Sequence, residues 1–159
     1  ISQLKGRKRS LIVVLARLQD PGNTGTIIRV AESFGATGII GLEGSVSPFN
    51  PKVVRASAGS LFRLPFFWRA SLNILAEFKA QGMQILGTAP GAEPSPKSCD
   101  WRRDTILIIG NEGGGMSPEE THLCDTVIGI RQSPGFNSLN SAIAAAILLY
   151  EASNQRWNS

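Results

Sequence analysis

The order of apolar and polar positions along the chain predicts alternating strands and helices. Short, nearly continuous apolar runs are typical of strands buried on both faces, and they occupy residues 10–18, 37–42, 62–67, 83–88, 105–109 and 126–130. Apolar residues at helical spacing predict helices over residues 24–34 and 70–81, with a shorter helix over 51–57. This alternation predicts an α/β domain with a parallel sheet and right-handed crossovers.

Capping residues mark several of the predicted helix ends. Asn23 is expected to cap the first helix, and Gly35 follows that helix as its C-cap. Ser117 and Glu120 occupy the N-cap and N3 positions of a later helix, with a proline at N1. The final helix, over residues 138–153, contains the run AIAAAILLY, which is apolar nearly all round. We therefore expect this helix to be buried on more than one side, and a homodimer interface is a natural cover.

Composition and charge indicate one globular domain with a basic arm. Hydrophobic residues make up 42% of the 159 residues and charged residues 18%, so we expect one domain over residues 10–159. The net charge of +4 lies in residues 1–9, where Lys5, Arg7, Lys8 and Arg9 precede a body with 12 basic and 12 acidic residues. Such an arm suits nucleic-acid contact, and a solvated terminus is the alternative.

Several classes of protein are excluded by what the sequence lacks. No run of about 18 apolar residues predicts a membrane-spanning helix, and the first residues lack the apolar core of a secretory signal. Cys99 and Cys124 are far apart and His122 is the only histidine, so we expect no disulfide scaffold, no metal site and a cytoplasmic location. The chain begins with Ile rather than Met, so we expect further residues upstream.

Three loops that follow predicted strands carry candidate chemistry. Ligands of open parallel sheets bind beyond the carboxyl ends of the strands, which here lead into residues 19–25, 110–116 and 131–140. Arg29 lies among apolar helix residues, so its guanidinium either reaches water or meets a phosphate or an oxygen that gains negative charge. Glu112 precedes three glycines and is either a solvated loop carboxylate or an acceptor for hydroxyl or amide groups. Asn140 is either a helix cap or a spare amide at the site.

Taken in order, these segments resemble three motifs of the SpoU/TrmH family of RNA 2′-O-methyltransferases. The first is Asp20-Pro21-Gly22-Asn23-x-Gly25-x-x-x-Arg29-x-Ala31-x-x-Phe34-Gly35. The second is Ile108-Ile109-Gly110-Asn111-Glu112-Gly113-x-Gly115-Met116-Ser117. The third is Ser138-Leu139-Asn140, followed by an alanine-rich helix that ends in Leu149-Tyr150-Glu151. The resemblance covers nearly the whole chain, and the sequence departs from the family pattern at Arg131, Gln132, Pro134 and Ser141.

This resemblance implies a fold, an activity and a set of site residues. The implied fold is a Rossmann-like parallel-sheet domain with a C-terminal trefoil knot, the SPOUT fold, in a homodimer with sites near the interface. The implied activity is transfer of a methyl group from S-adenosyl-L-methionine to a ribose 2′-hydroxyl of tRNA or rRNA, without a metal. Arg29 is the implied catalytic residue, with companions Asn23, Glu112, Ser138 and Asn140. The implied cofactor-binding residues are Thr88, Ala89, Gly110, Asn111, Glu112, Gly113, Ile130, Leu139 and Asn140.

Three other functions remain as alternatives. A non-catalytic RNA-binding relative should have lost Arg29 or the Ser-Leu-Asn triplet, and both are present. A nucleotide-binding oxidoreductase would need Gly-x-Gly-x-x-Gly after the first strand, where the chain has Asp-Pro-Gly-Asn-Thr-Gly. Methylation of a base instead of a ribose is the nearest alternative, and knotted base methyltransferases carry different motifs.

Overall fold

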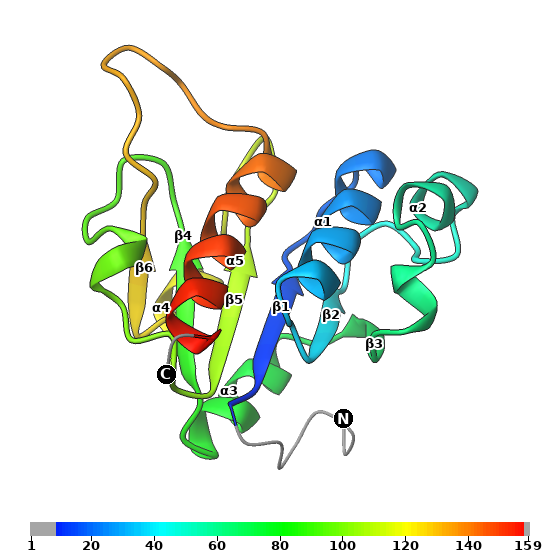
Figure 1. Cartoon of the computed structure of the whole chain (residues 1–159), viewed down its shortest axis with the longest axis horizontal. Coiled ribbons are helices and arrows are strands. Elements are labelled where there is room, and N and C mark those ends of the chain that lie inside the picture. The colour runs from blue at the N-terminus through cyan, green and yellow to red at the C-terminus, as the bar shows by residue number, and fades with distance from the viewer. Residues whose placement is uncertain (1–8, 158–159) are drawn as a thin grey trace.

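A single parallel sheet organises the domain, as shown by a computed structural model that describes residues 9–157 (Figure 1). Six strands lie in the order β3-β2-β1-β5-β4-β6, and every neighbouring pair is parallel. The strands are β1 (Leu11–Leu15), β2 (Gly38–Leu42), β3 (Phe66–Ala70), β4 (Gln84–Thr88), β5 (Thr105–Ile109) and β6 (Thr126–Ile128). The helices are α1 (Pro21–Ser33), α2 (Pro51–Ala56), α3 (Asn73–Ala80), α4 (Pro118–Leu123) and α5 (Ser141–Trp157). The predicted α/β class is confirmed, whereas residues 1–8 of the predicted basic arm lie outside the described residues.

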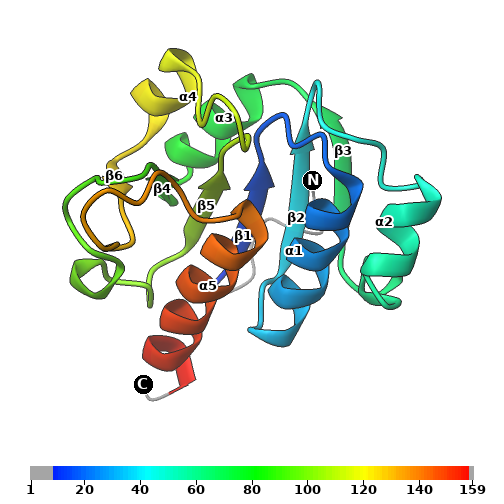
Figure 2. The same cartoon turned by 90° about the horizontal axis from the view of Figure 1, so that it is seen from above.

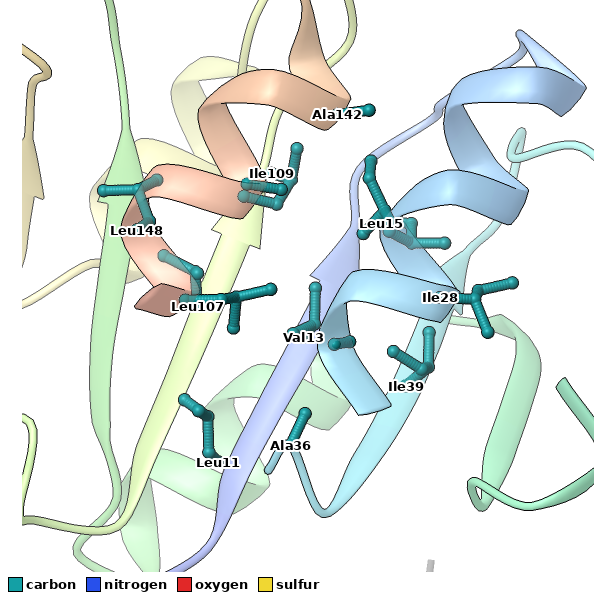
Figure 3. Close-up of a cluster of buried hydrophobic side chains, with 14 of the residues drawn as sticks. Leu11, Val13, Leu15, Ile28, Ala36, Ile39, Leu107, Ile109, Ala142 and Leu148 are labelled. Atoms are coloured by element: carbon teal, nitrogen blue, oxygen red, sulfur yellow. The ribbon is translucent and has the colours of Figure 1, made fainter. Parts of the chain in front are cut away.

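Both faces of the sheet are covered, which explains the unbroken apolar runs of its central strands. One face of β1, β2 and β5 packs against α1 and α5, which lie side by side across it (Figures 1 and 2). Figure 3 shows this layer, where Val13 and Leu107 of the sheet face Ile28 and Leu148 of the helices. The other face packs against α3, which contributes Phe78. Strand side chains alternate between faces, so a strand covered on both sides must be apolar at every position.

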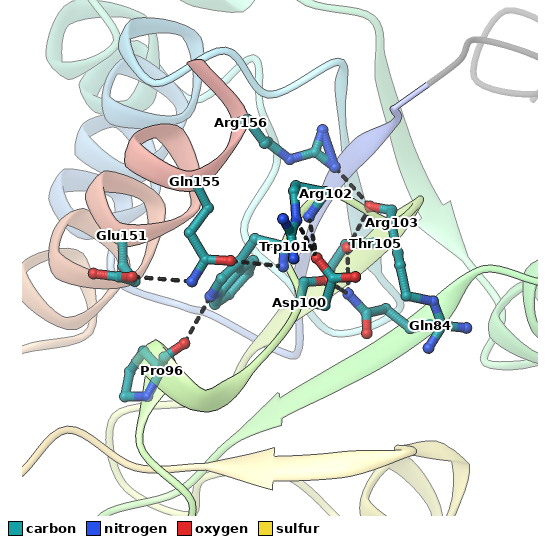
Figure 4. A network of polar contacts seen from close by, with 10 residues as sticks. All are labelled: Gln84, Pro96, Asp100, Trp101, Arg102, Arg103, Thr105, Glu151, Gln155 and Arg156. Atoms are coloured by element: carbon teal, nitrogen blue, oxygen red, sulfur yellow. Dashed lines mark hydrogen bonds and ion pairs between the residues drawn. The ribbon is translucent and has the colours of Figure 1, made fainter. Parts of the chain in front are cut away.

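The last helix is fixed by polar contacts at its C-terminal end as well as by apolar packing (Figure 4). The Trp101 backbone N–H donates to Gln155 Oε1 at 3.2 Å, and the Trp101 indole N–H donates to the Pro96 carbonyl at 2.8 Å. Arg156 donates to the Arg103 carbonyl at 2.8 Å. The bonds of Gln155 and Arg156 join α5 to the segment that leads into β5, and the indole bond of Trp101 holds that segment in place.

Three predicted element boundaries differ from the structure for local reasons. The strand predicted over 62–67 begins only at Phe66, because Ser60–Phe62 forms a 3₁₀ turn after Gly59, whose φ is +85°. The first helix begins at Pro21 because Asp20, not Asn23, is its N-cap and accepts the Asn23 N–H at 2.7 Å. The last helix, predicted over 138–153, begins at Ser141 and continues to Trp157.

The single chain buries only one side of α5, unlike the prediction of burial on several sides. Ile143, Ile147 and Tyr150 stay 53%, 40% and 56% exposed along the opposite side of the helix. No helix within the described residues 9–157 is long and apolar enough to cross a membrane. Over the same residues, no three His, Cys, Asp or Glu side chains gather as a metal ion would require.

After β6 the chain returns across the carboxyl ends of the strands before it enters α5. The Ala89 N–H donates to the Ile128 carbonyl at 3.1 Å, and the Gly129 N–H donates to the Pro94 carbonyl at 3.3 Å. A β-carbon at Gly129 would lie 2.2 Å from the Ala92 carbonyl oxygen, so only glycine allows this approach. The segments that follow β4 and β6 are therefore tightly apposed, and the trefoil knot itself stays a prediction of the family resemblance.

Candidate active site at the carboxyl ends of the strands

A cavity of about 440 Å³ opens where the chain leaves β4, β5 and β6. Its apolar wall includes Ile109, Val127 and Leu148, and polar residues of the loops, such as Asn111 and Gln132, complete the lining. Of the residues implied to hold the cofactor, the structure places eight around this cavity: Thr88, Ala89, Gly110, Asn111, Glu112, Gly113, Ile130 and Leu139. Asn140 does not line the cavity and lies instead in the polar cluster beside it. The position agrees with the rule that ligands of open parallel sheets bind beyond the carboxyl ends of the strands.

The loop after β5 is a tight reversal that presents Glu112. Asn111 and Gly115 exchange backbone hydrogen bonds of 3.1 and 2.9 Å, and Gly115 has φ +64°. A β-carbon on Gly110 would lie 2.7 Å from the Gly115 carbonyl carbon, so the reversal requires glycine there. The Asn111 side chain donates to the Arg17 carbonyl at 2.7 Å and accepts the Gly113 N–H at 2.8 Å. The loop is thereby fixed at both ends, and the carboxylate between them has a defined place.

Three predicted site residues meet in one hydrogen-bonded chain. Asn23 Nδ2 donates to Glu112 Oε1 at 3.0 Å, and Asn140 Nδ2 donates to Asn23 Oδ1 at 3.0 Å. The Ser141 hydroxyl donates to the same Glu112 oxygen at 3.1 Å. Asn140 also caps α5, because its Oδ1 accepts the Ala142 N–H at 2.9 Å. The cluster leaves the second Glu112 oxygen, Oε2, without a recorded partner among the described residues.

Two predicted catalytic residues lie outside this cluster. Arg29 is exposed on α1, six residues after Asn23 and about 9 Å further along the helix axis. Among residues 9–157 its guanidinium has no recorded hydrogen bond or ion pair, so it is free on the exposed side of α1. Ser138 is also exposed and lines the cavity from the segment that precedes α5.

Sequence reasoning missed four residues that shape the site. Ser141 and Gln132 were noted only as departures from the family pattern. Ser141 donates a hydrogen bond to Glu112, and the buried Oε1 of Gln132 has no partner in the described part of the chain. Arg17 pairs with Glu120 through both terminal nitrogens of its guanidinium, with Nη2 3.1 Å from Oε2, and the Glu120 side chain is only 1% exposed. The signal for Glu120 was its capping-box position, whereas nothing in the sequence marked Arg17 as its partner.

The short helix α4 closes the site from the side of β4 and β6. Ser117 and Glu120 form the predicted capping box, with the Ser117 N–H donating to Glu120 at 2.7 Å. In the same first turn a backbone N–H bond lowers the pKa of Glu119. At the other end of the helix, burial raises the pKa of the Cys124 thiol to about 11, and the nearby Lys79 only partly offsets this. The thiol is therefore protonated near neutral pH and is not an activated nucleophile.

Known proteins are similar to this chain in sequence. The chain is 44% identical over 146 residues to a tRNA/rRNA methyltransferase of Synechocystis sp., covering 91% of this chain and 53% of that protein. It is 36% identical over 162 residues to the 23S rRNA (uridine(2479)-2′-O)-methyltransferase of Streptomyces viridochromogenes, covering 98% of this chain and 56% of that protein. The chain thus spans about half the length of the curated relatives that it matches.

Solved structures give the same result. The SpoU methyltransferase AviRb of Streptomyces viridochromogenes superimposes with a TM-score of 0.92 at 35% identity, over 99% of this chain and 63% of that one. Its complex with the cofactor AdoMet superimposes with a TM-score of 0.89 at 35% identity, over 100% of this chain and 65% of that one. The profile of the SpoU rRNA Methylase family matches residues 10–150, from β1 through most of α5. The chain therefore belongs to the SpoU rRNA methylase family.

Proposed function

We propose that this chain binds S-adenosylmethionine and transfers its methyl group to a ribose 2′-hydroxyl of tRNA or rRNA. One observation carries the proposal: the cavity beyond β4, β5 and β6 adjoins the cluster of Asn23, Glu112 and Asn140. Two relatives named for 2′-O-methylation of 23S rRNA, at 36% and 33% identity, support the same chemistry. We also propose that the reaction takes place in the cytoplasm, since Cys99 and Cys124 are both free thiols.

The residues around the cavity fit the proposed cofactor. A volume of about 440 Å³ lies within the range of about 300–1,000 Å³ that is usual for sites of small ligands. The cavity combines apolar residues with polar ones, as an adenosine with its apolar ring faces and polar edges needs. Gln132 adds a buried Oε1 that has no partner within residues 9–157, and an amino group of the ligand would satisfy this acceptor. When bound, the cofactor supplies a methyl group that its sulfonium already activates for in-line displacement.

The protein's own residues contribute alignment and charge. Asn23 and Ser141 donate hydrogen bonds to one carboxylate oxygen of Glu112. The other oxygen is thereby oriented to accept a hydrogen bond from a ribose hydroxyl. Alignment of the attacking oxygen with the methyl group accounts for much of the acceleration in such a transfer. The free Arg29 guanidinium then stabilises the negative charge that develops on the 2′-oxygen and clamps the neighbouring phosphate. An arginine does this as a cation, because its pKa of about 12.5 or more keeps it protonated.

A second copy of the chain completes the proposal. The exposed side of α5 carries Ile143, Ile147 and Tyr150, and Tyr150 meets Phe34 edge-to-face at 5.8 Å between ring centroids. An apolar stripe of this kind is covered when two copies pack together. The stripe adjoins α1, the helix that carries Arg29, because Tyr150 contacts Phe34 at the C-terminal end of that helix. Analytical ultracentrifugation of the chain and of Ile147→Asp tests this, and a dimer is expected only for the unchanged chain.

The first experiment is calorimetric titration with S-adenosylhomocysteine, the expected product, and in parallel with NADH. Saturable binding of S-adenosylhomocysteine at about one site per chain, without binding of NADH, would support a methyltransferase over a nucleotide-binding oxidoreductase. Methylation of total tRNA and rRNA with labelled cofactor, followed by nuclease digestion and mass spectrometry, identifies the methylated position. Label on a base instead of a ribose would contradict the proposal.

The role of Arg29 is tested by Arg29→Lys, which keeps the charge but loses the planar fork. We expect kcat/KM for RNA to fall at least tenfold while the affinity for S-adenosylhomocysteine is unchanged. Arg102→Lys is the matched control, because Arg102 is an exposed arginine in an ion pair with Asp100, away from the cavity. Full activity of Arg29→Lys would refute the clamp.

A further inference from the structure

The middle of the chain is basic and aromatic, although the body as a whole is neutral. Residues 44–76 contain no Asp or Glu, four cations, four of the seven phenylalanines and one of the three tryptophans. The cations are Lys52, Arg55, Arg63 and Arg69, and the aromatic residues are Phe49, Phe62, Phe66, Phe67 and Trp68. This segment builds α2 and β3, at the edge of the sheet opposite β6 (Figure 1).

Within this segment, Phe49, Trp68 and Arg69 form a surface cluster that we call the aromatic platform. The Phe49 and Trp68 rings meet edge-to-face, with centroids 6.4 Å apart and planes at 88°. The Arg69 guanidinium carbon lies 5.8 Å from the Trp68 ring centroid, in the range of a cation–π contact. Beneath the cluster is Gly41 of β2, where a β-carbon would lie 3.4 Å from Trp68 Cδ1, so the indole rests on the sheet.

The platform and the neighbouring helix α2 contain an exposed ring, an unpaired donor and cations without a recorded ion pair among residues 9–157. Phe49 is 71% exposed, so most of its ring is open to a ligand. The Trp68 indole N–H is buried and has no acceptor within residues 9–157. Of the neighbouring cations, Arg63 is bound by Glu32 at 2.6 Å, whereas Lys52 and Arg55 are exposed on α2 and have no recorded ion pair in the described part. The aromatic rings offer a surface on which a base can stack, and the cations beside them offer positive charge to its phosphates.

The platform is joined to the candidate active site through α2. This helix packs closely against the first turns of α1, since a β-carbon on Gly25 would lie 2.5 Å from Ala56 Cβ and 2.7 Å from the Val53 carbonyl oxygen. Gly25 is two residues from Asn23 of the polar cluster. A strand of RNA that places one ribose at Glu112 can therefore continue over α2 toward Phe49.

We propose that the aromatic platform stacks an unpaired base of the RNA substrate, while Lys52 and Arg55 contact the adjoining phosphates. Single-stranded RNA fits better than duplex, because the bases of a duplex are stacked internally and cannot cover an exposed aromatic face. Arg69 adds a cation above the indole, as is common where bases stack on proteins. This inference rests on the proposed function, since it describes how the same RNA is held during methyl transfer.

The test is fluorescence anisotropy with a labelled 12-nucleotide oligouridine and a 12-base-pair RNA duplex. Phe49→Leu keeps an apolar side chain but loses the aromatic face, so we expect at least fivefold weaker oligouridine binding, from the usual contribution of base stacking. Phe49→Tyr should retain the affinity. Phe62→Ala is the matched control, because Phe62 is 72% exposed in the same segment but takes no part in the platform contacts. Lys52→Ala should lower the slope of log affinity against log salt by about 0.7.

The outcomes separate this inference from the proposed function. Each variant is also titrated with S-adenosylhomocysteine, whose affinity should not change, so a failed cofactor site and a failed platform are seen independently. Equal oligouridine affinity for the unchanged chain, Phe49→Leu and Phe62→Ala would overturn the platform. Preference for the duplex would overturn it as well. A change in sedimentation of Phe49→Leu without any change in RNA affinity would assign the surface to a protein contact and likewise refute the proposal.

Discussion

Replacing Arg17 by methionine should destabilise the fold because it leaves a buried carboxylate without its cation. Glu120 is 1% exposed and, among residues 9–157, its carboxylate accepts hydrogen bonds from Arg17 and from the capping N–H of Ser117 alone. Removing one partner of a buried ion pair typically costs about 3–5 kcal/mol. The Arg17 side chain is 37% exposed, so water screens part of the interaction, and we expect a loss of about 2 kcal/mol in the free energy of unfolding. For a domain of this size that corresponds to a fall of roughly 4–8 °C in Tm.

The assay is urea unfolding followed by tryptophan fluorescence, because Trp101 is fully buried in the core. Glu120→Gln removes the buried charge while its side-chain oxygen still accepts the Ser117 N–H. The double variant with Arg17→Met should therefore lose less than the sum of the single variants, with a coupling of roughly 1 kcal/mol or more. Arg102→Met is the control, since its partner Asp100 is 46% exposed, and no measurable change is expected.

Two results would refute this reasoning. If Arg17→Met unfolds at the same urea concentration as the unchanged chain, the pair contributes nothing to stability and Glu120 is satisfied by other donors. If the two substitutions are strictly additive, each side chain acts independently, although the structure places them in contact.

Three further predictions follow from single residues. Gly110→Ala should weaken S-adenosylhomocysteine binding at least tenfold in calorimetry, because the added β-carbon would lie 2.7 Å from the Gly115 carbonyl carbon. Gly114→Ala is the control and should bind normally, because a β-carbon there meets open space. Burial raises the pKa of both thiols, that of Cys124 to about 11, so alkylation at pH 8 followed by mass spectrometry should modify Cys99 first and leave Cys124 largely intact. The hydrogen bond from Arg63 lowers the pKa of Glu32 to about 2. In urea titrations the unchanged chain should therefore be more stable than Glu32→Gln above pH 4.5, and this difference should be lost as the pH falls from 4.5 toward 2.

The strands were predictable because burial on both faces leaves an unambiguous pattern. Residues 105–109 were predicted and are observed as β5 with the same bounds. The start of β3 was predicted too early, because the apolar residues of 62–64 continue the pattern through a 3₁₀ turn. Hydrophobicity alone does not separate a turn from a strand in so short a run, and only the positive φ of Gly59 shows where the chain reverses.

The site was predictable as a set of loops but not as a set of contacts. The rule for parallel sheets brought the three loops to one end, and Asn23, Glu112 and Asn140 do lie together there. These contacts join residues 89 and 117 positions apart, so no local pattern could show which side chains touch. The Arg17–Glu120 pair is equally remote, at 103 positions, and its two members look in the sequence like a cation near the end of the strand predicted over residues 10–18 and a helix-capping carboxylate.

Asn140 shows why one residue type is required where the loops converge. Its Oδ1 accepts the first N–H groups of α5, while its Nδ2 donates to Asn23, so the side chain must be both an acceptor and a donor. An aspartate would cap the helix equally well, but it could not donate to Asn23 and would add a second negative charge beside Glu112. A serine would cap the helix through a shorter side chain that offers one donor and cannot hold both bonds in the same geometry. Asn140, the cap of α5, thus donates to Asn23, and Asn23 donates to Glu112. This chain of hydrogen bonds fixes the orientation of the Glu112 carboxylate before any ligand binds.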